Sequence, residues 1–191
     1  MLDGMKSEDH PAGWRIVESE IVIQTPHLRL RRDQIELPSG KRVGNYYVRE
    51  SRGFAIVFPI TPDERVVLVR QYKHGIGRSV LELPAGAIDE GELPEECARR
   101  ELTEETGYVA AAPLELAGTF VYDPTSSTTH YHLYIAHGAE LRAEQRFDDT
   151  EDIEVELATF AQLRNYVRDG TLEVGAHVAS VYYVLDRLGR L

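Results

Sequence analysis

Three glutamates in the middle of the chain have the spacing of a metal-assisted reaction centre. Glu101, Glu104 and Glu105 lie in the segment 95–106, which consists of good helix formers. At about 100° per residue they fall within an arc of about 100° on one helical face, where their repulsion is unfavourable without a cation. Crowded oxygen ligands suit Mg²⁺ or Mn²⁺. Such an ion polarises a phosphoryl oxygen and activates a water, so the expected reaction is hydrolysis at phosphorus.

An acidic helix also has a simpler explanation. Charged runs usually form a solvated face, and Arg99 and Arg100 stand beside the glutamates as local ion-pair partners. The three carboxylates alone favour this second interpretation, and the surrounding segment reverses it.

The segment from Gly86 to Tyr108, GAIDEGELPEECARRELTEETGY, resembles the Nudix box, G-x5-E-x7-R-E-U-x-E-E-x-G-U, in which U is aliphatic. The matching positions are Gly86, Glu92, Arg100, Glu101, Leu102, Glu104, Glu105 and Gly107. Only Tyr108 departs from the pattern, at a packing position. So many specified residues at fixed spacing indicate a Nudix hydrolase.

The resemblance assigns roles to the box residues. It makes Glu101 and Glu105 metal ligands and Glu104 a ligand or proton acceptor, so that all three are catalytic. The backbone carbonyl of Ala85 would be a further metal ligand.

Four box residues are structural by the same resemblance. Glu92 and Arg100 form an ion pair that braces the loop against the helix, although Glu92 could also reach a metal through water. Gly86 and Gly107 mark the start of the box and the end of its helix.

Features outside the box resemble the ADP-ribose pyrophosphatase branch of the family. They are a strand-like N-terminal segment, the runs VRQYK at 69–73 and ELPAG at 82–86, and Pro124 beyond the box. The resemblance implies ADP-ribose as the preferred substrate, with AMP and ribose 5-phosphate as products.

Four residues are candidates for substrate binding. In the branch, a basic residue after the Gln-aromatic pair contacts the diphosphate. Here it is Lys73, where arginine is more usual, and a lysine binds phosphate as a point charge. Arg70 is the alternative, and either could equally be a surface side chain. Glu82 is the third candidate for substrate binding. Trp14 is the fourth, and it would either stack on the adenine or pack inside the protein.

The loop from Tyr122 to Thr129 departs from the branch. That loop usually supplies a glutamate five residues after the proline, and here the position is Thr129. A threonine cannot act as a base near neutral pH without an activator. We therefore expect the base elsewhere. The candidates are Glu104, Glu151, Glu154 and Asp123, of which Asp123 is also typical of a turn.

Other reactive residues receive simpler interpretations. Cys97 has no histidine at helical spacing and is expected to be a packing residue. His130 and His132 alternate on a strand without a third ligand at convincing spacing, so we expect substrate-contacting or exposed histidines rather than a metal pair. The acidic stretch from Asp148 to Glu154 is either a solvated loop or a source of one extra carboxylate.

The elements that position these residues alternate between strands and helices. Strand-like runs lie at 20–25, 28–37, 42–48, 54–59, 66–71, 114–121 and 131–136. Helices are predicted from Pro94 to the cap at Gly107, from the cap Thr159 to about Gly170, and over about 176–188. This order favours an α/β sandwich, which the resemblance makes a Nudix α/β/α sandwich with a mixed sheet, preceded by a small antiparallel β segment. We divide the chain into a mobile tail at 1–13, the β segment at 14–50 and a Nudix domain at 51–191.

Composition excludes several classes of partner. The formal net charge of −11 over 191 residues argues against nucleic acid or an anionic membrane as the main partner. The first residues lack the apolar core of a signal peptide, and no apolar run could span a bilayer. The expected location is the cytoplasm.

The resemblance also implies a homodimer, because in this branch the N-terminal segment packs across a two-fold axis and shapes the partner's site. Two rival functions remain open. One is hydrolysis of another nucleotide sugar such as GDP-mannose, which shares the diphosphate. The other is a non-catalytic sensor of ADP-ribose, against which the intact box carboxylates count.

Overall fold

The computed structural model describes residues 13–146 and 152–191. All but the last residue of the expected tail therefore lie outside the described residues, as do Asp148 and Glu151. The chain divides into two compact units. The first contains the residues up to Arg52 together with Val121–His130, and the second contains Gly53–Phe120 and Tyr131–Leu191.

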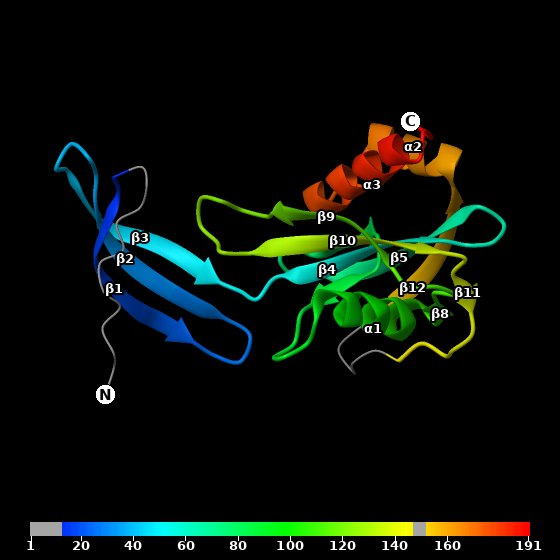
Figure 1. The fold of residues 1–191 in the computed structure, drawn as a ribbon, viewed down its shortest axis with the longest axis horizontal. Coiled ribbons are helices and arrows are strands. Elements are labelled where there is room, and N and C mark those ends of the chain that lie inside the picture. Colours follow the sequence, from blue (N-terminus) through cyan, green and yellow to red (C-terminus); the bar gives the residue numbers. More distant parts are fainter. Residues whose placement is uncertain (1–12, 147–151) are drawn as a thin grey trace. The chain divides into compact units, whose positions relative to one another are not determined.

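The first unit is built on a three-stranded antiparallel sheet, which confirms the predicted N-terminal β segment (Figure 1). Its strands are β1 (Arg15–Gln24), β2 (Arg29–Glu36) and β3 (Arg42–Glu50), in the order β1-β2-β3. The turn between β2 and β3 is closed by a hydrogen bond from the N–H of Gly40 to the carbonyl of Leu37 (2.8 Å). Gly40 has φ = 77°, a conformation that favours glycine.

The loop that follows Val121 is part of this first unit. The N–H of Arg49 donates to the carbonyl of Ser126 (2.8 Å), and the N–H of Thr128 donates to the carbonyl of Arg49 (3.0 Å). The hydroxyl of Tyr46 donates to the carbonyl of Thr125 (2.6 Å). The loop thus satisfies backbone groups at the end of β3.

The second unit contains a seven-stranded mixed sheet with the order β12-β5-β4-β10-β9, to which β6 adds beside β5 and β7 beside β4. Its strands are β4 (Phe54–Ile60), β5 (Arg65–Lys73), β6 (Arg78–Glu82), β7 (Ala85–Ala87), β9 (Glu115–Val121), β10 (His130–His137) and β12 (Ile153–Thr159). The pair β4 and β10 is parallel, whereas β5 runs antiparallel to β4, β6 and β12. A separate two-stranded pair joins β8 (Tyr108–Val109) and β11 (Glu140–Leu141).

Helices cover both faces of this sheet (Figure 1). They are α1 (Pro94–Thr106), α2 (Phe160–Asp169) and α3 (Gly175–Arg187). Ala55 and Val57 of β4 pack in the core cluster on the α1 side, whereas Ile56 and Phe58 pack in the cluster that includes residues of α2 and α3. Side chains alternate along a strand, so β4 contributes to both layers of core. The predicted α/β/α sandwich with a mixed sheet is confirmed.

The helix boundaries follow local capping chemistry. The hydroxyl of Thr159 accepts from the N–H of Gln162 (3.2 Å), and Gly170 ends α2 with φ = 81°. Gly107 ends α1 with φ = 73°, and its N–H donates to the carbonyl of Thr103 (2.8 Å). Within the described ranges, no helix is long and apolar enough to cross a lipid bilayer.

Candidate active site

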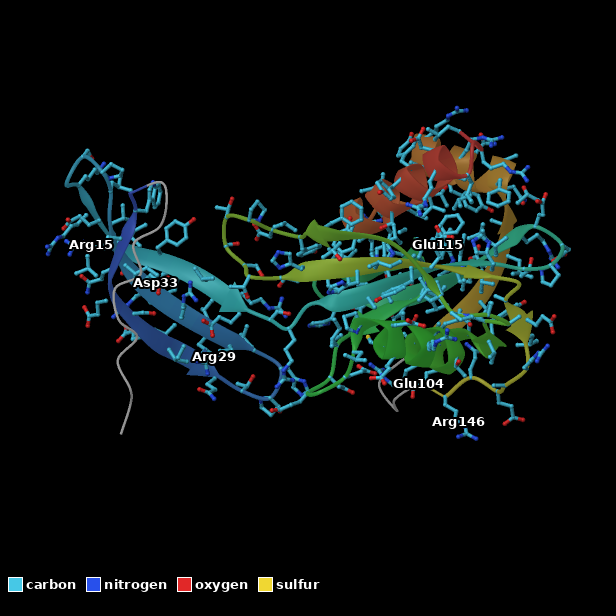
Figure 2. The ribbon with its side chains drawn as sticks, in the orientation of Figure 1. Arg15, Arg29, Asp33, Glu104, Glu115 and Arg146 are labelled. Carbon is cyan, nitrogen blue, oxygen red and sulfur yellow. The ribbon has the colours of Figure 1, made fainter. Side chains whose placement is uncertain are left out.

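Helix α1 packs its apolar side against the sheet and carries the glutamates of the box. Cys97, Ala98 and Leu102 are buried in the core cluster that contains Ala55 and Val57. The glutamates at 101 and 104 are partly exposed, and Figure 2 shows Glu104 on this helix. Pro94 occupies the first turn, where its missing N–H costs no hydrogen bond.

Glu101 lies directly against strand β7, which precedes the helix. A Cβ atom placed on Gly86 would be only 1.9 Å from Oε1 of Glu101 and 2.0 Å from its Cδ. Only glycine therefore leaves room for this carboxylate at the backbone.

Glu105 approaches the same strand one residue earlier. Its Oε2 accepts from the N–H of Ala85 (3.0 Å), and Glu105 is only 5% exposed. Strand β7 and two glutamates of α1 are thereby in direct contact.

Arg100 links the loop to the helix. Its Nε and Nη2 donate to Glu92 (2.8 and 3.0 Å), and its Nη1 donates to Glu101 (2.6 Å) and Glu104 (3.2 Å). These carboxylates, Glu92 first, hold the pKa of the Arg100 guanidinium above its usual value. Hydrogen bonding to Arg100 lowers the pKa of Glu92 in turn. One positive charge faces three negative ones.

The carboxylates do not form a closed ligand cluster in this conformation. Among residues 13–146 and 152–191, no three His, Cys, Asp or Glu side chains are gathered closely enough to hold a metal ion. Glu101 and Glu104 instead share Nη1 of Arg100. The residues nevertheless fit a divalent cation, because the space above Gly86 admits a carboxylate and the donors are hard oxygens of the kind that Mg²⁺ and Mn²⁺ prefer.

Two of the predicted substrate-binding residues also lie together in the second unit. Nζ of Lys73 is 3.0 Å from Oε2 of Glu82, and Glu82 is buried. Arg70 instead forms an ion pair with Glu156 on the neighbouring strand β12, with Nε 2.6 Å from Oε1.

Trp14 belongs to the first unit. It lines a cavity of about 160 Å³ with Arg31, Asp33, Tyr46 and four further residues of the N-terminal sheet. Asp33 is buried, and its carboxylate accepts hydrogen bonds from the Ser19 hydroxyl and from Nε of Arg31. Figure 2 shows Asp33 in this sheet.

The candidates for the catalytic base are found in different settings. Glu104 is partly exposed on α1, and Glu154 lies exposed in β12 rather than in a loop, opposite Arg70. The carboxylate of Asp123 accepts from the N–H groups of Thr125 (3.1 Å) and Ser126 (3.3 Å), which is the expected turn-forming role. Hydrogen bonds, that of the Ser126 hydroxyl first, lower the pKa of Asp123.

The remaining reactive residues have structural partners. Cys97 is fully buried, as predicted for a packing residue, and burial raises the pKa of its thiol to about 12. Nδ1 of His130 is 3.0 Å from the carbonyl of Thr128, and Nδ1 of His132 is 3.0 Å from Oγ1 of Thr119.

One buried histidine was not anticipated from the sequence. His177 of α3 is 5% exposed, and its Nδ1 accepts from the N–H of Leu83 (3.1 Å). A single histidine in an amphipathic helix carries no pattern that would have identified it.

Comparison with known proteins agrees with these observations. Residues 50–177 match the NUDIX domain, and residues 14–48 match the nucleoside diphosphate sugar hydrolase N-terminal domain. A "Methanol dehydrogenase activator" of Bacillus methanolicus is 28% identical over 171 residues, which cover 89% of this chain and 91% of that protein. The "ADP-ribose pyrophosphatase" of Bacillus subtilis (strain 168) is 32% identical over 124 residues, which cover 64% and 66%.

A solved structure shares the fold across the full length of both chains. The "Crystal structure of ADP compounds hydrolase" has a TM-score of 0.78 at 21% identity and covers 100% of each chain. Since the NUDIX match alone spans well over half of the residues, this chain belongs to the Nudix hydrolase family.

Proposed function

We propose that this Nudix hydrolase is a divalent-metal-dependent pyrophosphohydrolase that cleaves ADP-ribose to AMP and ribose 5-phosphate. The observation that carries the proposal is the contact of Glu101 and Glu105 with Ala85 and Gly86 of strand β7. It sets two carboxylates of the box at one place. The match at residues 14–48 and the similarity to an ADP-ribose pyrophosphatase support the substrate class.

The box residues would both bind the metal ion and accept a proton from the attacking water. Glu101, Glu104 and Glu105, with the carbonyl of Ala85, would hold Mg²⁺ or Mn²⁺. When bound, the cation supplies positive charge to the diphosphate and lowers the pKa of the attacking water. The side chain of Glu104 is 43% exposed, so it can accept the proton that this water loses. The ion pair of Glu92 and Arg100 braces the loop between β7 and α1.

Substrate binding would involve cations outside the box. The side chain of Lys73 is 42% exposed, which leaves its ammonium available to a diphosphate oxygen. Arg70 already pairs with Glu156, which makes it the weaker candidate. Trp14 and Tyr46 line the cavity of the N-terminal sheet and could stack on a base.

The N-terminal sheet also supports a homodimer. Four apolar residues of β1 remain 38–41% exposed: Val17, Ile21, Val22 and Ile23. Neighbouring exposed apolar side chains on an edge strand mark an association surface. We propose that a second copy of the chain covers this strand.

The substrate is tested with purified protein and a panel that contains ADP-ribose, GDP-mannose and related compounds, with Mg²⁺ or Mn²⁺ at saturation. We expect turnover to be highest with ADP-ribose and AMP to appear with ribose 5-phosphate in equal amounts. A higher turnover with GDP-mannose would show that ADP-ribose is not the preferred substrate. Calorimetric binding of ADP-ribose without any turnover would contradict the enzyme hypothesis and favour a non-catalytic sensor.

A further inference from the structure

A second group of buried polar side chains lies beside the box loop, outside the box itself. Glu82 ends strand β6 and His177 lies in the first turns of α3, and each is only 5% exposed. Oε1 of Glu82 is 3.4 Å from Nε2 of His177, and Oε2 of Glu82 is 3.0 Å from Nζ of Lys73. The carboxylate therefore has a different partner at each oxygen.

The hydrogen bond to the backbone fixes the tautomer of His177. A backbone N–H can only donate, so Nδ1 of His177, which is 3.1 Å from the nitrogen of Leu83, must be the acceptor. The proton of the neutral ring is then on Nε2, the atom that faces Glu82. Burial, with a smaller effect of Lys73, lowers the pKa of His177 to about 3, so the ring is neutral near pH 7.

The position of the Lys73 ammonium depends on Glu82. In the register of β5 and β6, Lys73 pairs with Arg78, whereas Glu82 pairs with Val69. The lysine must therefore extend back along its own strand, past Gln71, to reach the carboxylate. Oε1 of Gln71 also accepts from Nζ. These two acceptors draw the ammonium away from the turn after β5 and toward Leu83, where the loop of the box begins.

We propose that His177 is a positioning residue that fixes the carboxylate of Glu82 and, through it, the Lys73 ammonium that binds the substrate diphosphate. The inference rests on the proposed function for its substrate class. It adds a residue from the far end of the chain to the binding site. His177 itself touches neither substrate nor metal.

Two amide variants separate the two contacts of the imidazole. In His177→Gln the amide nitrogen can replace Nε2 and still donate to Glu82. In His177→Asn the amide oxygen can replace Nδ1 and still accept from Leu83, but no donor reaches Glu82. A purely structural histidine would be replaced better by Asn, and a positioning histidine better by Gln.

We expect His177→Asn to raise KM for the best substrate of the panel about tenfold, the usual cost of losing a hydrogen bond to a charged group, while kcat changes less than about threefold. His177→Gln should keep KM within about threefold of the wild type. In a Lys73→Ala background, His177→Asn should add less than about twofold, because both changes act through the same ammonium. Equal KM values for the two amide variants, or independent effects of His177 and Lys73, would overturn the proposal.

Two further measurements keep the inference separate from the proposed function. Calorimetric binding of the same compound without metal should weaken in His177→Asn and not in His177→Gln, even if the protein proves to be a sensor. Nitrogen-15 NMR of the wild-type protein, with the His177 signals assigned by their loss in His177→Gln, should show the proton on Nε2. This last test needs neither a substrate nor a folded Asn variant, and a proton on Nδ1 would refute the inference.

Discussion

Replacing Gly86 by alanine should disable the enzyme without unfolding it. The added Cβ would lie 1.9, 2.0 and 2.5 Å from Oε1, Cδ and Oε2 of Glu101, whereas real Cβ atoms essentially never approach another atom within 3.0 Å. The carboxylate must therefore move by about 1 Å or more. Gly86 is not among the glycines with positive φ, so alanine adds no backbone strain there.

The carboxylate cannot move freely, because Oε1 of Glu101 accepts from Nη1 of Arg100 (2.6 Å) and Arg100 is also bound to Glu92. A misplacement of about 1 Å in a catalytic centre typically costs about 10²-fold in rate. We expect kcat of Gly86→Ala to fall by about that factor at saturating Mg²⁺. Overpacking costs about 1–3 kcal/mol, which lowers the melting temperature by several degrees and leaves the protein folded at 25 °C.

Steady-state kinetics on ADP-ribose, or on the best substrate of the panel, measure this effect. Gly75→Ala is the matched control, because its Cβ would meet nothing within 4 Å and its φ is ordinary. If the substitution acts through Glu101, then Gly86→Ala combined with Glu101→Gln should be little slower than Glu101→Gln alone. A kcat for Gly86→Ala within about threefold of the wild type, or fully additive effects, would refute the reasoning.

Four further outcomes are expected. Glu104→Gln and Glu105→Gln should each lower kcat at least ~10²-fold with the fold intact, whereas Glu95→Gln, which changes only a pair with an arginine on the same helix, should not; near-native kcat in both variants would show that the site is misplaced. Asp123→Asn should keep the acidic limb of the pH–rate profile, because this carboxylate is bonded within its own loop; loss of that limb would make it the base. Light scattering should give about twice the 21.6 kDa of one chain, and a monomeric mass for the active enzyme would exclude the dimer. The Arg100 guanidinium holds the pKa of Glu92 below 4.5, so ionised Glu92 stabilises the fold above that pH and this stabilisation is lost as the pH falls. In thermal melts below about pH 4.5, the melting temperature of Glu92→Gln should therefore fall less than that of the wild type, and identical pH dependences would contradict this.

The sequence predicted the features that depend on local chemistry. Helix α1 begins at Pro94 and ends before Gly107, as predicted, because both residues act through their own backbone. Gly40 lies in the turn between β2 and β3, in the gap between the strand-like runs predicted at 28–37 and 42–48, because a left-handed conformation favours glycine. The glutamates of the box share one side of α1 because the helical period fixes their directions.

Two kinds of feature were missed. Strand β12 was not predicted, although Ile153, Val155 and Leu157 alternate with polar residues, because the strand follows directly on the acidic stretch and was grouped with it. Strands β6 and β7 contain five and three residues, too few for a periodic signal.

The long-range contacts of the candidate site could not be predicted from residue spacing either. Oε1 of Glu101 lies against Gly86, 15 positions earlier in the sequence, only because helix α1 packs beside strand β7. The bond from Leu83 to His177 joins residues 94 apart. Which distant residues meet depends on the packing of the whole unit, and no local period encodes it.

The backbone bonds between β3 and the loop at 121–130 make the first unit discontinuous along the chain. The hydroxyl of Tyr46 adds a side-chain hydrogen bond to the carbonyl of Thr125, 79 positions further along the chain. A growing polypeptide can pair β1, β2 and β3 soon after they are made, but the N–H and carbonyl of Arg49 must wait for the loop between β9 and β10. Closing so long a segment is entropically costly and slows folding. The N-terminal sheet therefore reaches its final form only after more than half of the second unit's sequence has been synthesised, so the folding of the first unit is coupled to the synthesis of the second.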